Sequence, residues 1–303
     1  MRNSKTNELV LTGLFTAIII IMAFTPLGYI PLVVINATII HIPVILGSLF
    51  CGPKKGAFLG FVFGFTSCLK ATIVGGTLSS FVFSPVLAAS LVGTSGIFKS
   101  LFIAFVPRIL VGVIPYFVYI GIKKVLASEK KNLWGTVLNV LMSVFLAFGV
   151  YAFLGKMSES LSQAAALGIG IAVGAVVFIV VEAVFIRKSI QVIPFVYAGV
   201  AGAMTNTLLV MGSIFVLYKD AYADAIGVAG NAVLGVITGV ISFNGVIEAI
   251  VAAIIVYLVW IGFKYNQTNC SKINSDRFKI NVKLYVRRTD KVRLFYKQLD
   301  WER

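Results

Sequence analysis

Long runs of apolar residues, separated by short polar stretches, dominate this chain. Eight runs have about the 20-residue length that an α-helix needs to cross a bilayer, and they end at charged residues, Pro or Gly. The expected spans are 9–25, 35–51, 56–73, 98–122, 134–154, 164–186, 195–217 and 229–263. The last run is long enough to contain a loop or a broken helix. We therefore predict a bundle of about eight transmembrane helices.

The composition supports this class. Hydrophobic residues make up 59% of the chain, charged residues only 12%, and the mean hydropathy is +0.99. Such a chain is expected to be an all-α integral membrane protein, because a membrane span must satisfy its backbone groups internally. The first run has no small-residue cleavage site and should remain as a helix. The three cysteines are scattered and indicate neither a disulfide framework nor a metal site.

Lysine and arginine positions predict the orientation. With the N-terminus in the cytoplasm and all eight runs spanning, most basic loops fall on the inner side, as the positive-inside rule requires. The tail over 265–303 carries ten Lys or Arg against four Asp or Glu, so it is predicted to be cytoplasmic and to contact anionic lipid. We thus expect a protein of the cell membrane with both termini in the cytoplasm and two regions, a transmembrane bundle over 1–264 and a basic tail over 265–303.

Small residues recur at four-residue spacing in several runs. The stretch "GAFLGFVFG" places Gly56, Gly60 and Gly64 on one helix face, and the first run carries Gly13 and Ala17. Such faces let two helices approach closely. Within the chain this predicts ordinary bundle packing. In the first helix, at the edge of a bundle, the same face could instead serve another protein.

A few polar residues lie inside the apolar runs, where they are costly and are functional candidates. His41 is the only histidine, and Arg108 carries a permanent positive charge in "FVPRILVG". Because a guanidinium binds a carboxylate through a paired fork, a cluster around it would suit a small organic acid with hydroxyl or amide groups. The alternative is that Arg108 pairs with Glu248 or Glu182 in the bundle. The candidate binding residues are Asn36, Thr38, His41, Arg108, Asn206 and Asn244.

Enzyme chemistry has little support. One histidine cannot supply the ligands of a membrane metalloprotease, and the chain contains neither a GxSxG elbow nor a GxxxxGK[ST] phosphate loop. No metal, no cofactor and no nucleic-acid partner are expected. A transport role would then depend on an ion gradient or on the motor of a partner protein.

Three stretches carry a resemblance to a known family. The run "INATIIHIPVILGSLFCGPKKGAFLGFVFGFTSCLKAT", the tripeptide "FSP" and the segment "VPRILVGVIPY" resemble the membrane-embedded substrate-binding (S) components of energy-coupling factor (ECF) vitamin transporters. The resemblance covers roughly residues 5–124, and "AGAMTNTLLVMGSIF" with the last run is similar to the final two spans of the family. Pantothenate-type members look most similar.

The resemblance implies a six-helix bundle that binds a small water-soluble vitamin near the outer face, under the first and third loops. It adds Phe83 and Ser84 of "FSP" to the candidate binding residues. It also implies that Gly13 and Ala17 form the small-xxx-small docking motif, with Gly in place of the usual first Ala. Their partner would be a transmembrane coupling subunit that carries two ATP-binding subunits, and the bundle would topple in the membrane to release substrate.

The chain departs from this family by an insertion at about 126–194, which contains two of the eight runs. An added pair preserves the topology of the other six. Three other interpretations stay open: a stand-alone secondary transporter using Arg108, Glu248 and His41 as an ion relay, a structural membrane protein without ligand, and an intramembrane enzyme.

Overall fold

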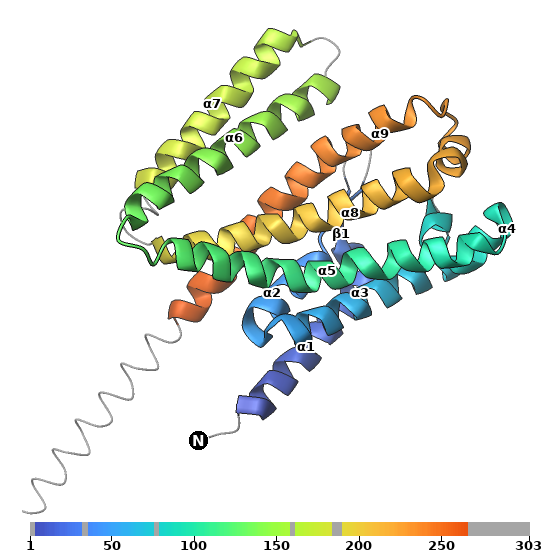
Figure 1. Cartoon of the computed structure of the whole chain (residues 1–303), viewed down its shortest axis with the longest axis horizontal. Helices are drawn as coiled ribbons and strands as arrows, with labels where there is room; N and C mark the ends of the chain where they lie inside the picture. Colours follow the sequence, from blue (N-terminus) through green and yellow to red (C-terminus); the bar gives the residue numbers. More distant parts are fainter. Residues whose placement is uncertain (1–3, 32–35, 76–78, 158–160, 184–189, 266–303) are drawn as a thin grey trace, which may run out of the picture. The chain divides into compact units, whose positions relative to one another are not determined.

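The computed structural model describes residues 4–31, 36–75, 79–157, 161–183 and 190–265 (Figure 1). The chain divides into two compact units, Met1–Tyr257 and Leu258–Arg303. The basic tail over 266–303 lies outside the described residues. In the described part the elements are α1 (Ser4–Phe24), η1 (Pro26–Gly28), β1 (Tyr29–Pro31), β2 (Asn36–Thr38), α2 (His41–Cys51), α3 (Pro53–Ile73), η2 (Ser80–Val82), α4 (Pro85–Val92), α5 (Ser95–Val125), α6 (Lys131–Met157), α7 (Gln163–Val181), η4 (Ile190–Val192), α8 (Ile193–Ile226), α9 (Val233–Val240) and η5 (Ile241–Gly245), and a helix over 246–265 follows.

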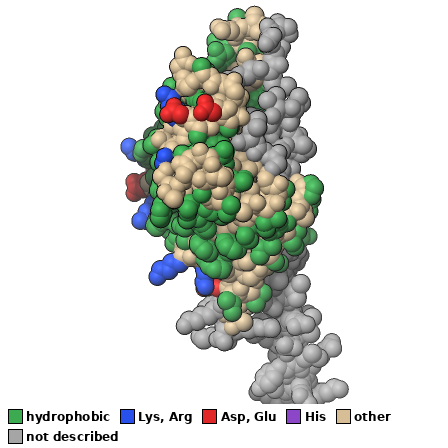
Figure 2. Space-filling model, turned by 90° about the vertical axis from the view of Figure 1, so that its right-hand side faces the viewer, with side chains coloured by type: hydrophobic (Ala, Val, Ile, Leu, Met, Phe, Trp, Pro, Cys, Tyr) green, Lys and Arg blue, Asp and Glu red, His purple; other side chains and the backbone are tan. Residues whose placement is uncertain are grey.

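Seven of the described helices are long and apolar enough to cross a membrane, which confirms a multi-pass, all-helical membrane protein. In Figure 2 hydrophobic side chains cover much of the middle of the visible face, and charged ones lie in its upper part, along the left edge and near the bottom. The seven spans are Thr6–Phe24, Pro53–Ile73, Ser95–Val125, Lys131–Gly155, Gln163–Val181, Ile193–Ile226 and Val233–Tyr265. They correspond to all the predicted spans except the second.

The second predicted span, 35–51, is shorter than expected. Its helix α2 has 11 residues, about 16 Å at 1.5 Å per residue, against a hydrocarbon thickness of about 30 Å. The residues before it are extended instead, because β2 pairs with β1 in an antiparallel register that sets Thr38 opposite Tyr29. All side chains from His41 to Ser48 are buried, and non-helical backbone at membrane depth is tolerated when protein surrounds it.

The glycine face of α3 packs directly on α5. A Cβ at Gly60 would collide with the backbone carbonyl of Arg108, and one at Gly64 would lie 2.6 Å from the Ala104 carbonyl. The hydroxyl of Ser48 in α2 donates to the Gly112 carbonyl of α5 at 2.6 Å. The predicted close packing is therefore present, and it holds α2 and α3 against the part of α5 that carries Arg108.

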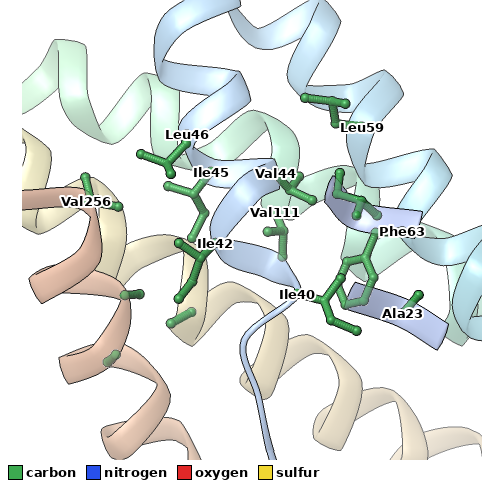
Figure 3. Close-up of a cluster of buried hydrophobic side chains, with 14 residues drawn as sticks. Ala23, Ile40, Ile42, Val44, Ile45, Leu46, Leu59, Phe63, Val111 and Val256 are labelled. Carbon is green, nitrogen blue, oxygen red and sulfur yellow. The ribbon is translucent and has the colours of Figure 1, made fainter. Parts of the chain in front are cut away.

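One buried apolar cluster joins six helices around α2. Figure 3 shows Ile42, Ile45 and Leu46 of α2 together with Val111 of α5 and Val256 of the last span. The other buried members come from α1, α2 and the residue before it, α3, α8 and the last span, and among the described residues none comes from α6 or α7. The buried members of this core thus come from six helices, and the partly buried Phe145 of α6 packs against them.

Helices α6 and α7 form a hairpin (Figure 1). A Cβ at Gly170 would lie 2.6 Å from the Ala147 carbonyl, and one at Gly174 would lie 2.8 Å from the Ala147 Cβ. The two helices are thus in close contact through small residues, as the four-residue spacing predicts. They occupy most of the stretch 126–194.

Candidate functional site

Two hydrogen bonds to the Glu248 side chain connect β2, just before α2, to the last two spans, and we call this arrangement the Glu248 bracket. The Glu248 carboxylate accepts from the Thr38 backbone N–H through Oε1 and from the Thr207 hydroxyl through Oε2, both at 2.7 Å. Glu248 is only 4% exposed, and a carboxylate in such surroundings needs donors of this kind. The bracket fixes β2, α8 and the helix over 246–265 relative to one another, and it places the neighbouring residues of all three in one region.

Buried polar atoms beside this bracket have no hydrogen-bond partner within the described ranges. They are both ring nitrogens of His41, Oδ1 of Asn206 and Oδ1 of Asn244. His41 is three residues from Thr38, Asn206 precedes Thr207, and Asn244 is one turn before Glu248. Native proteins leave few buried polar atoms unsatisfied, because each costs free energy. The imidazole and the two amides therefore have buried hydrogen-bonding atoms that are chemically suited to a polar ligand.

Arg108 supplies a positive charge to the same region. It is 6% exposed, and its Nη1 donates to the Ile103 carbonyl at 2.5 Å. That carbonyl is available because Pro107, four residues after Ile103, has no N–H for the usual helical bond. The guanidinium lies over the ring of Phe83, 4.7 Å from its centroid, and interacts electrostatically with Glu248. The "VPR" sequence therefore orients the arginine inside the bundle.

Phe83 and Ser84, the two candidates from the "FSP" tripeptide between α3 and α4, have different positions. Phe83 contacts the guanidinium of Arg108, which brings it to the cluster. Ser84 is the N-cap of α4, where its hydroxyl accepts from the Leu87 N–H at 3.3 Å and lies 2.8 Å from the Thr72 hydroxyl. The hydroxyl of Ser84 thus has a structural function, since capping and the bond to α3 both hold the loop in place.

The remaining binding candidates lie in the strand before α2. Thr38 contributes its backbone N–H to the Glu248 bracket, and it lies in β2, not on a helix face as we predicted for the span 35–51. Asn36 pairs with Pro31 through the backbone register, and its side chain lies outside the described part. Sequence reasoning singled out Glu248 as a possible partner of Arg108 and as a member of a possible ion relay, and it missed the two hydrogen bonds by which Glu248 joins β2 to α8.

Glu182, the other predicted partner of Arg108, belongs to a separate cluster. Its carboxylate accepts from the Thr136 hydroxyl at 2.8 Å and from the Asn139 amide at 3.0 Å. These bonds connect α6 with the C-terminal end of α7.

Throughout the described residues no group of three or more His, Cys, Asp or Glu could hold a metal ion.

The predicted docking face is exposed. Gly13 and Ala17 both lie on the outside of α1, and a Cβ at Gly13 would meet nothing within 4 Å among the described residues. Leu9, Val10 and Ile21 on the same helix are also more than half exposed. One side of α1 is therefore open to lipid or to another protein.

Comparison with known proteins identifies the family. The family described as "ECF transporter, substrate-specific component" matches residues 7–187, which include the α6–α7 hairpin. The pantothenic acid transporter PanT of Lactococcus lactis subsp. cremoris is 42% identical over 161 residues, or 49% of this chain and 78% of that protein. The pantothenate transporter PanT of Leuconostoc mesenteroides is 37% identical over 119 residues, or 38% of this chain and 51% of that protein. Together with the buried polar cluster in a multi-pass bundle, these matches establish that the chain belongs to the substrate-specific components of ECF transporters.

Proposed function

We propose that this protein is the high-affinity, membrane-embedded vitamin-binding subunit of an ATP-driven ECF importer, and that its substrate is pantothenate. The observation that carries the proposal is the set of unsatisfied buried atoms of His41, Asn206 and Asn244 beside Arg108. The names of the two relatives supply the substrate.

The chemistry of pantothenate fits these side chains. Its carboxylate needs a desolvated positive charge, which Arg108 carries on a planar group suited to paired hydrogen bonds. Its amide and hydroxyl groups both donate and accept, as a neutral imidazole does, while the Oδ1 atoms of Asn206 and Asn244 accept. Phe83 packs on the guanidinium and restricts the orientations of the Arg108 side chain. Less binding free energy is therefore lost in ordering Arg108 when the ligand binds.

The direct test is calorimetric titration of the purified protein with pantothenate and with other water-soluble vitamins. We expect saturable binding of pantothenate and none of vitamins that lack a carboxylate. Mass spectrometry of the co-purified ligand gives an independent identification. Recovery of a different vitamin would contradict the proposed substrate.

Transport distinguishes an ECF importer from a stand-alone secondary transporter. In liposomes, uptake should require the transmembrane coupling subunit with two ATP-binding subunits, and it should stop without ATP. Uptake by the protein alone, driven by an ion gradient, would contradict the proposed dependence on partners.

His41→Ala should weaken pantothenate binding by about 1–3 kcal/mol, the usual cost of one buried hydrogen-bonding partner. The matched control is Ser48→Ala in the same helix, whose hydroxyl already donates to Gly112. The control should lower the thermal stability and leave the affinity unchanged. Equal affinities of His41→Ala and wild type would remove His41 from the site.

The proposed orientation, with both termini in the cytoplasm, requires that the short helix α2 with the extended residues before it crosses the membrane in addition to the seven long helices. It can be tested by labelling. In a variant without native cysteines, Ser162→Cys at the start of α7 should react with an external, membrane-impermeant thiol reagent, and Lys130→Cys before α6 should be protected. Both positions are exposed in the structure, so burial would not explain protection. The reverse pattern would contradict the orientation.

We further propose that the bundle comprises residues 1–264, and that residues about 126–194 are a helix pair added to a six-helix S component. The buried core around α2, with members from the other six helices, supports this division. The proposed cytoplasmic tail, 265–303, would contact anionic lipid through its excess of basic residues.

A further inference from the structure

The last span is irregular at the binding cluster. Its helix Val233–Tyr265 contains the π-helical turn η5, Ile241–Gly245, and Asn244 lies in that turn. A π-turn is rare, persists when its surroundings stabilise it, and occurs frequently at functional sites. The direction in which the Asn244 amide points therefore depends on the contacts that hold η5.

Helix α8 holds one side of the turn. A Cβ at Gly245 would lie 3.3 Å from Cγ2 of Thr207 and 3.6 Å from Sδ of Met204. The Thr207 hydroxyl also donates to the carboxylate of Glu248, which lies on the last span about one turn after Gly245. These contacts connect the turn with the helix that carries Asn206.

Helix α6 holds the other side. The rings of Phe153 and Phe243 are stacked, with centroids 4.6 Å apart and an interplanar angle of 17°. One turn earlier on α6, Gly149 is in such close contact with Val246 that a Cβ there would collide with the valine side chain. Phe243 and Val246 flank Asn244 and Gly245 on the chain, so α6 contacts the turn on both sides of the binding residue.

Helix α6 is held in turn by α7. The Asn139 amide donates to the Phe178 carbonyl and to the Glu182 carboxylate, both at 3.0 Å. Interhelical hydrogen bonds of this kind resist sliding of one helix along another inside a membrane. The surface that α6 presents to η5 is therefore set by the hairpin as a unit.

We propose that the α6–α7 hairpin positions a ligand-binding residue: Phe153, supported by Gly149, holds the π-turn so that Asn244 directs its amide at the ligand. Phe153 is a positioning residue and acts through Asn244. The inference rests on the proposed function, because Asn244 needs to be positioned only if the cluster binds ligand.

A double-mutant cycle tests the inference by calorimetric titration of the full-length protein with pantothenate. Phe153→Ala should weaken binding roughly threefold to thirtyfold, a usual range for coupled neighbouring residues. In an Asn244→Ala background the same substitution should have no further effect, and Phe153→Tyr, which keeps the ring, should bind like wild type. Phe148→Ala is the matched control, since that ring is on the same helix but 62% exposed, and it should not change the affinity.

Gly149→Ala provides a second variant if Phe153→Ala is poorly folded. Its methyl group should displace Val246 and weaken binding only when Asn244 is present. Unchanged affinity in both α6 variants, or equal losses with and without Asn244, would overturn the positioning role while the proposed function stands. A wild-type protein that does not bind pantothenate would contradict the proposed function and, with it, this inference.

Discussion

Arg108→Ala should weaken pantothenate binding by about 2–5 kcal/mol, the range for removing one partner of a buried, hydrogen-bonded charge pair. The physical reason is that the carboxylate of the ligand must leave water to enter the bundle, and a positive charge beside it offsets that cost. Arg108 is the positive charge that the structure places beside the cluster, where it stacks on Phe83. Calorimetric titration measures the loss directly.

Arg108→Lys separates charge from geometry. Lysine retains the charge but not the planar fork, so this variant should recover only part of the lost affinity. Thermal unfolding without ligand must be measured for both variants, because Arg108 also donates to the Ile103 carbonyl. Wild-type affinity in a folded Arg108→Ala protein would contradict the ligand role and assign Arg108 to the internal structure of the bundle.

Gly13→Trp should abolish ATP-dependent uptake in liposomes that contain the coupling subunit, while the affinity for pantothenate stays unchanged. A small residue allows the backbone of another helix to approach closely, and an indole group at this position would keep the two apart. Ala17→Trp should have the same effect. Pull-down of the coupling subunit measures the loss of association.

The matched control for this experiment is Gly168→Trp in α7. Gly168 is also exposed in a spanning helix, and a Cβ there would likewise meet nothing within 4 Å among the described residues. This variant should associate and transport like wild type if docking is specific to α1. Normal association of Gly13→Trp would contradict docking through this face, and loss in both variants would indicate a general effect of tryptophan.

Hydropathy alone was sufficient to locate the spans, because the cost of burying polar groups in lipid depends on the local composition of each segment. Even Pro107 and Pro115 do not interrupt α5, which continues from Ser95 to Val125. The limit of this reasoning is α2. An apolar run that protein surrounds has the same composition as one that lipid surrounds, so the sequence predicted a full span where the structure has a strand and a short, buried helix.

For the polar residues, too, the sequence predicts one part and the tertiary structure decides the other. Their cost in an apolar chain is enough to mark His41, Arg108, Asn206 and Asn244 as candidates from the sequence alone. Which of their atoms remain available depends on partners that are far away in sequence. Thr38 and Glu248, for example, are 210 residues apart and yet share a hydrogen bond.

The sequence by itself therefore determined the membrane class, the close-packing glycine faces and the list of polar candidates, since each follows from local composition and spacing, and it indicated the family through the resemblance of particular stretches to known members. Only the tertiary structure decided that Glu248 forms a bracket, that Ser84 caps a helix and that α6 contacts the π-turn beside Asn244. The physical reason is that hydrogen bonds and ring contacts between distant segments depend on how the helices pack, and local composition carries no information about that packing.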